Sequence, residues 1–205
     1  FKARPWLYQT PEELLIKASN GASDFGNKFG QPLINGSLLT FEHTEGAGKG
    51  EDFGYDKVIM LAGGIGFAPA DDSMKEDPEP GDLIIVLGGD NYRIGMGGAA
   101  VSSVGTGQYS NAIELNAVQR ANPEMQKRVA NVIRAMVEND SNPVRSIHDH
   151  GAGGHLNCLS ELIDKSGGTV YVDNLPVGDP TLSDKEIIGN ESQERMGLLV
   201  NKQDT

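Results

Sequence analysis

Cysteine is almost absent from this chain, because its 205 residues include one, Cys158. A disulfide framework within the chain and a zinc site built from several cysteines are therefore excluded. Apolar runs are also short, and none reaches the roughly 20 residues that span a membrane. No signal peptide is visible. These shortages indicate a cytoplasmic protein in which Cys158 is a small buried side chain.

Basic residues are in short supply as well. Lysine and arginine total 17 against 29 acidic residues, which gives a formal net charge of −12. Nucleic acids and anionic membranes are poor partners for such a chain, since both require a basic surface. A small phosphorylated ligand remains compatible with this charge, because backbone N–H groups, a metal ion or a few arginines can hold it.

The chain opens on FKARPWLYQ rather than on methionine, and it stops soon after a strand-like run. We therefore expect a piece of a longer polypeptide. A length of 205 residues accommodates one large domain, or one domain with a fragment of another. The glycine-rich polar stretch 46–56 is the expected linker between a unit of residues 1–45 and a domain of residues 57–205.

Turn residues and apolar spacing predict both helices and strands. Helices are expected over 11–19, from Asn122 to about residue 137, after the glycines at 151–154, and for one turn after Ser183. Strands are expected over 37–42, 57–64, 82–89, 144–149, 169–173 and 195–200. In the helix after the glycines, one apolar face contains Leu156, Leu159, Leu162 and Ile163. The expected fold class is α+β, with a mixed sheet and the two longer helices packed on one face.

The stretch HDHGAGGH, residues 148–155, stands between a strand and a helix. Glycines let a backbone approach a phosphate, and a helix N-terminus favours an anion. Asp149 is therefore a candidate Mg²⁺ ligand, because Mg²⁺ joins carboxylates to phosphate oxygens. The alternative is that Asp149 caps the helix. Zinc is not favoured, since His148, His150 and His155 do not make a clean ligand set.

A second polar cluster, KEIIGNESQER at 185–195, runs into an apolar strand. Such a density of polar groups beside a strand indicates a binding site. The ordinary alternatives are a solvated loop, a capping box completed by Glu186, and an ion pair of Arg195 with Glu191 or Glu194.

A third cluster, VQRANPEM at 118–125, places Gln119 and Arg120 just before a helix start. That position can bind an anion. The alternative is a loop followed by an ordinary asparagine cap.

Five motifs stand in one order: MLAGGIG (60–66), IGMGGAAVSS (94–103), VQRANPEM (118–125), IHDHGAGG (147–154) and NESQER (190–195). They resemble the phosphoribosylformylglycinamidine synthase family, which is related to aminoimidazole ribonucleotide synthetase. The resemblance covers nearly the whole chain, and NESQER after HDxGAGG is specific to this family. The family's short form carries Arg-Asp-Gly where this chain has Gly95-Met96-Gly97, so the chain is more similar to the long, single-chain form.

The resemblance implies an ATP-dependent ligase of purine biosynthesis. Such an enzyme converts formylglycinamide ribonucleotide to formylglycinamidine ribonucleotide with ammonia taken from glutamine. ATP phosphorylates the amide oxygen, so that phosphate, a good leaving group, departs when ammonia attacks. The implied cofactors are Mg²⁺ and ATP or ADP, and the implied partners are a glutaminase domain and further synthetase domains of the same polypeptide.

The resemblance also implies roles for individual residues. Metal ligands are matched by Asp149, Glu186 and Asn190. Substrate-binding positions are matched by Gln119, Glu191, Ser192 and Gln193, and nucleotide-binding positions by His148 and Gly151. The family's catalytic histidine and ATP-binding lysine lie upstream of the matched region, so the chain alone is expected to be inactive.

The resemblance assigns residues 1–45 to the end of a first nucleotide-binding subdomain. It assigns residues 57–205 to a synthetase C-terminal-like domain that is truncated at its end. Two other functions stay open: a non-catalytic half that holds a structural ADP and Mg²⁺, and a related superfamily kinase or synthetase. The NESQER motif argues against the second of these.

Overall fold

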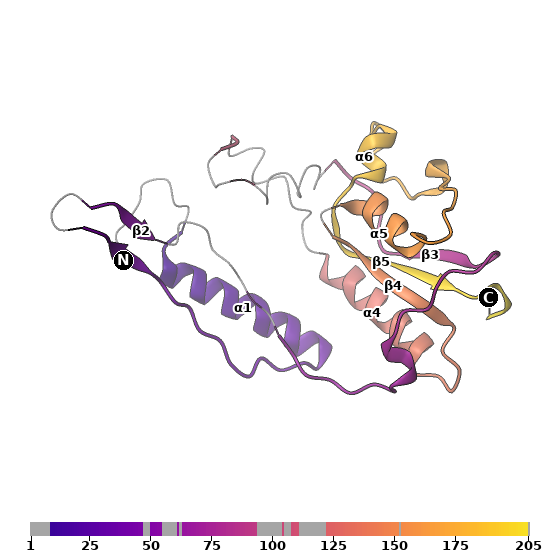
Figure 1. Ribbon diagram of the computed structural model, residues 1–205, viewed down its shortest axis with the longest axis horizontal. Helices are drawn as coiled ribbons and strands as arrows, with labels where there is room; N and C mark the ends of the chain where they lie inside the picture. Colours follow the sequence, from indigo (N-terminus) through magenta and orange to yellow (C-terminus); the bar gives the residue numbers. More distant parts are fainter. Residues whose placement is uncertain are drawn as a thin grey trace. The chain divides into compact units, whose positions relative to one another are not determined.

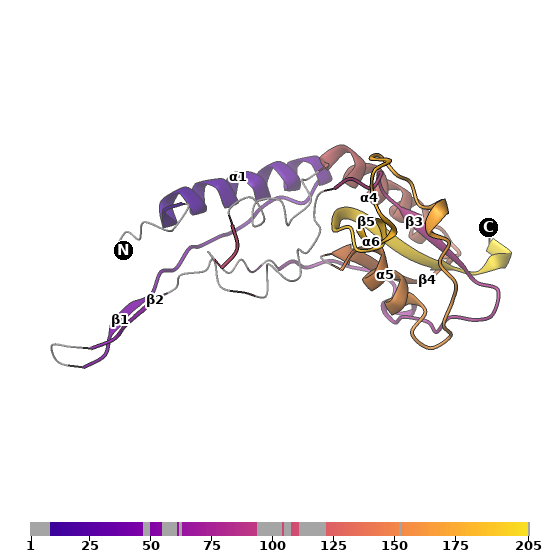
Figure 2. The same cartoon turned by 90° about the horizontal axis from the view of Figure 1, so that it is seen from above.

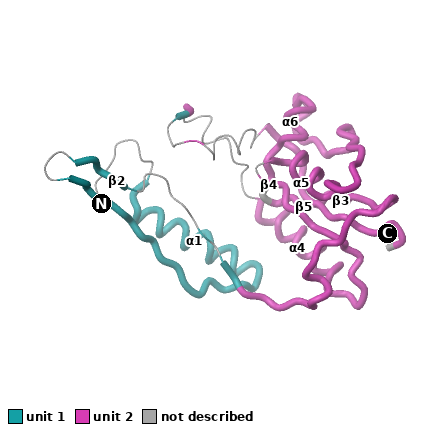
Figure 3. The backbone as a smooth tube through the Cα atoms, viewed as in Figure 1, with its two compact units in different colours: residues 1–64, 105–108 teal, residues 65–104, 109–205 magenta. Residues whose placement is uncertain are grey.

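The computed structural model describes residues 9–46, 50–54, 61, 63–93, 104, 108–110, 122–151 and 153–204. The chain divides into two compact units, residues 1–64 with 105–108 and residues 65–104 with 109–205 (Figure 3). Each unit is described by itself below. No helix in the described residues is both long and apolar enough to cross a membrane.

The first unit contains one helix and a small hairpin. Helix α1 (Pro11–Phe29) begins with a capping box between Thr10 and Glu13 and ends at Gly30, whose φ is 68°. It runs well past the expected residue 19, and stacked Phe25 and Phe29 rings, 4.2 Å apart, stabilise its last turn.

The hairpin of the first unit corrects one expectation from the sequence. Strand β1 (Glu42–Thr44) pairs antiparallel with β2 (Asp52–Gly54). The strand expected over 37–42 is wrong except at its last residue, and the stretch expected to be a linker, 46–56, contains β2. Each strand has three residues, which is too short for apolar alternation to reveal it.

The second unit is built on a three-stranded sheet of β3 (Leu83–Leu87), β4 (Val144–Gly151) and β5 (Ser192–Val200). The strand order is β3-β5-β4, which places the last strand in the centre (Figure 1). Both pairings are antiparallel, and an isolated parallel bridge joins Asn91 to Val177. These elements confirm the α+β class and three of the expected strands.

Two helices cover this sheet, α4 (Pro123–Val137) and α5 (Gly154–Leu162). Figures 1 and 2 show them on opposite faces, which corrects the expectation that both pack on one face. The physical reason lies in β5, where Leu198, Leu199 and Val200 are each at most 2% exposed. Consecutive strand residues point to opposite faces, so three buried neighbours require cover on both sides.

Helix α5 packs closely against β5. Cys158, Leu162 and Leu199 form a buried cluster, and the expected burial of Cys158 is confirmed. A Cβ at Gly197 would lie 2.4 Å from the Cys158 Sγ atom, so glycine allows this close approach. Leu156 was expected on the same face but is 59% exposed.

The remaining elements are short. Helix α6 (Asp184–Ile188) follows the expected capping box, and single 3-10 turns form at Asp71–Ser73, Val172–Asn174 and Lys202–Asp204. The strand expected over 169–173 is wrong, because Asp173 and Asn174 favour a turn and the nearby sheet bridge is made by Val177 instead. Most of the strand expected over 57–64 lies outside the described residues.

Candidate functional site

The two polar motifs of the second unit meet at one end of the sheet. Gly151, the last residue of β4, lies opposite Ser192, the first residue of β5. The register shifts between Asp149 and Gly151, which marks an irregularity at this end of the ladder. Antiparallel pairing therefore places the residues after β4 beside Asn190 and Glu191, which precede β5.

Two glycines shape the turn from β4 into α5. Gly151 and Gly154 have φ values of 47° and 62°, in the left-handed region that favours glycine. A Cβ at Gly154 would lie 2.6 Å from the carbonyl oxygen of Asn190. The glycine turn thus packs directly against the main chain of the NESQER motif.

Asp149 is an exposed residue of β4 beside this turn. Its Oδ1 atom lies 2.8 Å from the position that a Cβ of Gly151 would take. The N-cap of α5 is Gly153 and no side chain caps the helix, so the interpretation of Asp149 as a helix cap is wrong. The neighbouring His148 has its Nδ1 atom 2.6 Å from the carbonyl oxygen of Asp149.

The start of NESQER is buried, which rules out a solvated loop. Asn190, Glu191 and Ser192 are 0%, 3% and 0% exposed. The Asn190 side-chain amide donates to the carbonyl oxygen of Tyr92. Among the described residues, the Asn190 Oδ1 and Ser192 Oγ atoms have no hydrogen-bond partner. Buried polar atoms of this kind are uncommon in proteins, and a water molecule, an ion or a catalytic role can account for them.

Glu186 has a structural role already. One carboxylate oxygen accepts hydrogen bonds from the Ser183 backbone N–H and hydroxyl, each 2.8 Å long, which completes the capping box of α6. The other lies 3.4 Å from a guanidinium nitrogen of Arg93. The hydrogen bond from the Ser183 backbone N–H is the largest cause that lowers the pKa of Glu186 below its ordinary value. Two of the expected substrate contacts cannot be placed: Gln119 and the side chain of Gln193 lie outside what the structure describes.

A buried polar cluster beside the site was not expected from the sequence. His150 and His155 are fully buried, with Nε2 of the first 2.9 Å from Nδ1 of the second. Burial, the largest cause, lowers the pKa of His150 to about 3 and that of His155 to about 4. Both imidazoles are therefore neutral near pH 7. In the described part of the chain, no three His, Cys, Asp or Glu side chains group as metal ligands.

Arg195 completes this cluster. Its side chain is 1% exposed and donates to the carbonyl oxygens of Gly89 and Asp90 and to the side-chain oxygen of Asn91. One of its nitrogens lies 3.4 Å from His155 Nε2. The alternative that Arg195 serves only to pair with a neighbouring glutamate is therefore wrong. The sequence contained a signal for the burial of Arg195. Alternate residues of a strand share a face, and Arg195 shares its face with Gly197 and Leu199, which pack against α5.

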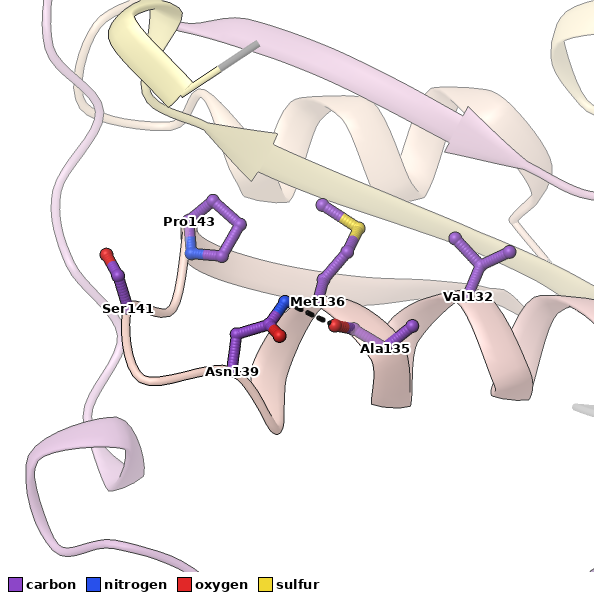
Figure 4. Close-up of a pocket in the computed structure, with 6 residues that line it drawn as sticks. All are labelled: Val132, Ala135, Met136, Asn139, Ser141 and Pro143. Atoms are coloured by element: carbon purple, nitrogen blue, oxygen red, sulfur yellow. Dashed lines mark hydrogen bonds between the residues drawn. The ribbon is translucent and has the colours of Figure 1, made fainter.

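A shallow hollow of about 480 Å³ lies at the C-terminal half of α4 (Figure 4). Its lining is Val132, Ala135, Met136, Asn139, Ser141 and Pro143. Two of these residues are hydrogen-bonded, since the Asn139 side chain donates to the carbonyl oxygen of Ala135. The hollow shares no residue with the polar site at the ends of β4 and β5.

Comparisons with known proteins match most of the chain. The family described as AIR synthase related protein, C-terminal domain, matches residues 79–205. A human protein named phosphoribosylformylglycinamidine synthase is 46% identical over 198 residues, and its Dictyostelium discoideum counterpart is 43% identical over 194. The alignments cover 96% and 93% of this chain but 15% and 14% of those proteins.

Solved structures give the same result for the fold. The structure "T. maritima PurL complexed with FGAR" has a TM-score of 0.62 and 27% sequence identity, over 89% of this chain and 29% of that one. A crystal structure of phosphoribosylformylglycinamidine synthase II from Thermotoga maritima has a TM-score of 0.50 and 28% identity. It covers 64% of this chain and 19% of that one.

Proposed function

The chain belongs to the AIR synthase related family, and we propose that it is the part of a phosphoribosylformylglycinamidine synthase that binds Mg²⁺, the nucleotide phosphates and the amide substrate. The whole activity converts formylglycinamide ribonucleotide, ATP and glutamine-derived ammonia to formylglycinamidine ribonucleotide. Synthetase and glutaminase regions beyond the matched segment provide the remaining groups, because the chain spans about 15% of the human relative.

One observation carries this proposal: the acid-and-glycine motif lies directly beside NESQER. Gly151 pairs with Ser192, and Gly154 packs on the backbone of Asn190. These motifs are 36 or more residues apart in the sequence, so their convergence is a property of the fold. This proximity supports a site in which the proposed substrate and nucleotide positions are neighbours.

The donor set fits Mg²⁺. Asp149 offers an exposed carboxylate, and Asn190 offers a buried amide oxygen without a hydrogen-bond partner among the described residues. Mg²⁺ prefers such oxygen ligands together with phosphate oxygens. Glu186 fits less simply, since its carboxylate already serves the α6 cap and lies near Arg93. When bound, Mg²⁺ neutralises phosphate charge and so favours transfer of the phosphoryl group.

The protein's own groups bind and orient the reactants. The N-terminus of α5 directs backbone N–H groups toward an anion, and Gly151 lets the backbone come close to a phosphate, with His148 beside it. Glu191, Ser192 and Gln193, together with Gln119, hold the formylglycinamide ribonucleotide. The buried Ser192 hydroxyl can donate to or accept from the substrate amide without adding a charge that opposes phosphorylation.

Asp149→Asn in the full-length protein tests the proposal. We expect kcat/KM to fall more than about 100-fold with little change in melting temperature, because loss of a metal ligand exceeds the 10–100-fold cost of a second-shell partner. Asp173→Asn, at an exposed position of a 3-10 turn, is the matched control and should remain active. A fall in melting temperature without loss of turnover would instead support the structural ADP–Mg²⁺ site and reject the catalytic assignment.

A further inference from the structure

Arg195 reaches out of β5 to the chain that follows β3. Three of its N–H groups are donated to three consecutive residues: 3.0 Å to the Gly89 carbonyl oxygen, 2.7 Å to the Asp90 carbonyl oxygen and 2.7 Å to Asn91 Oδ1. The guanidinium fork is rigid and planar, so this set of contacts fixes the shape of the Gly89–Asn91 turn. A lysine could not reproduce the three directions.

Asn91 connects this segment to Pro176 and Gly178. It is fully buried, and its backbone and side-chain N–H groups both donate to the Pro176 carbonyl oxygen, at 3.0 and 2.7 Å. Its own carbonyl oxygen accepts from the Gly178 backbone at 2.9 Å. The turn after β3 is thus held on both sides, and the next residue, Tyr92, takes a defined place.

Tyr92 contacts the candidate metal ligand. Its carbonyl oxygen accepts a hydrogen bond from the Asn190 side-chain amide. A carbonyl can only accept, so the NH₂ end of Asn190 must face Tyr92 and the oxygen end must face away. That oxygen is buried and has no hydrogen-bond partner in the part of the chain that is described. In this orientation the Asn190 side-chain oxygen is available to a ligand.

We propose that Arg195 is a positioning residue, which acts through the Gly89–Asn91 turn and the Tyr92 carbonyl to direct the Asn190 side-chain oxygen toward the metal. The inference deepens the proposed function and rests on it, since it requires Asn190 to be a ligand. Neither Arg195 nor Asn91 touches substrate or metal in this scheme. Their effect on binding passes entirely through Asn190.

A double-mutant cycle in the full-length protein tests this, with Mn²⁺ and ADP as the probe and calorimetric affinity as the readout. Arg195→Lys and Asn190→Ala should each weaken Mn²⁺–ADP binding by roughly 10-fold or more, as loss of an orienting partner or of a ligand does. In the Asn190→Ala background, Arg195→Lys should change the affinity less than about twofold. Additive effects of the two changes would overturn the proposal, because Arg195 would then act by another route.

Controls separate positioning from simple loss of stability. Arg145 lies near the opposite end of β4 and pairs with Glu79. The control variant Arg145→Lys should therefore not change the affinity for Mn²⁺–ADP. If Arg195→Lys does not fold, Asn91→Ser takes its place in the cycle, since it removes both side-chain links of the turn. If Asn190→Ala binds Mn²⁺–ADP normally, the proposed metal role fails. If Asn190→Ala binds Mn²⁺–ADP weakly while Arg195→Lys has the same affinity as Arg145→Lys, the positioning role of Arg195 fails and the metal role of Asn190 stands.

Discussion

His150 Nε2 and His155 Nδ1 lie 2.9 Å apart, and neither side chain has exposed surface. The rings meet edge to face, 4.7 Å apart at 84°. A hydrogen bond between two imidazole nitrogens uses one N–H and one lone pair, so both rings can be neutral. Burial lowers the pKa of each below its ordinary value, to about 3 for His150 and about 4 for His155. The pair links β4 to α5 without any charge of its own.

This pair makes stability depend on pH below neutrality. Between pH 6.5 and about 4 the unfolded chain binds protons that the folded chain does not, so the free energy of unfolding falls as the pH falls. In His155→Gln the slope should be smaller by up to about 1.4 kcal/mol per pH unit. Urea unfolding of the full-length protein from pH 7.5 to 5 measures this slope. His43→Gln, at an exposed position, is the control. Equal slopes for all three proteins would show that the pair does not titrate as inferred.

Glu186→Gln separates the two roles proposed for this side chain. Glutamine can still complete a capping box, but it lacks the charge that attracts a metal. We expect Mn²⁺–ADP affinity to fall roughly 10-fold or more, with little change in melting temperature. Ser183→Ala is the converse change, and should cost about 0.5–2 kcal/mol of stability while affinity is kept. If Glu186→Gln retains full affinity, Glu186 belongs to the cap alone.

Gly154→Ala should damage binding as well as stability. Its φ of 62° is unfavourable for alanine, and the new Cβ would stand 2.6 Å from the Asn190 carbonyl oxygen. Gly167 has nearly the same φ, 66°, with nothing within 4 Å of a Cβ, so Gly167→Ala isolates the backbone strain. That strain is worth about 1–3 kcal/mol. Only Gly154→Ala should also displace Asn190 and weaken Mn²⁺–ADP binding. Indistinguishable affinities for the two variants would contradict the close packing of the glycine turn on Asn190.

Gly197→Ala should destabilise the second unit by overpacking. The added Cβ would lie 2.4 Å from the Cys158 Sγ atom and 2.9 Å from a methyl group of Leu162. A cost of about 1–3 kcal/mol is typical of an extra methyl group in a packed core. Replacing the sulfur as well, in Gly197→Ala with Cys158→Ala, should recover part of this loss. Thermal unfolding of Gly197→Ala, Cys158→Ala and the double variant tests it, and strictly additive effects of the two changes would rule out the contact.

Periodic apolar residues made much of the second unit predictable. The helix from Pro123 and strands β3, β4 and β5 were expected, because their buried faces follow helical or extended spacing. The run Gly197–Val200 contains a further signal. Four apolar or small residues in succession indicate a strand buried on both faces, and hence helices on both sides of the sheet.

Polar elements were harder to predict. The β1–β2 hairpin is held by backbone pairing between exposed residues, which leaves no apolar pattern in the sequence. The role of Arg195 depends on residues more than 100 positions away in the chain, such as Asn91. Proximity in the sequence suggested Glu191 and Glu194 as partners of Arg195, because contacts between distant residues cannot be inferred from one sequence. The meeting of Gly151 with Ser192 likewise required knowledge of the strand pairing.

The strand order β3-β5-β4 has a consequence for biosynthesis. Each outer strand hydrogen-bonds to β5, which is the last of the three to leave the ribosome. About 110 residues, roughly half the chain, separate β3 from its partner, so the sheet has high contact order and its assembly is slow. While translation of residues 88–191 continues, the apolar strand Leu83–Leu87 waits without its central neighbour. Nascent chains stalled before Ser192 should therefore bind chaperones and aggregate more readily than chains that extend past Val200.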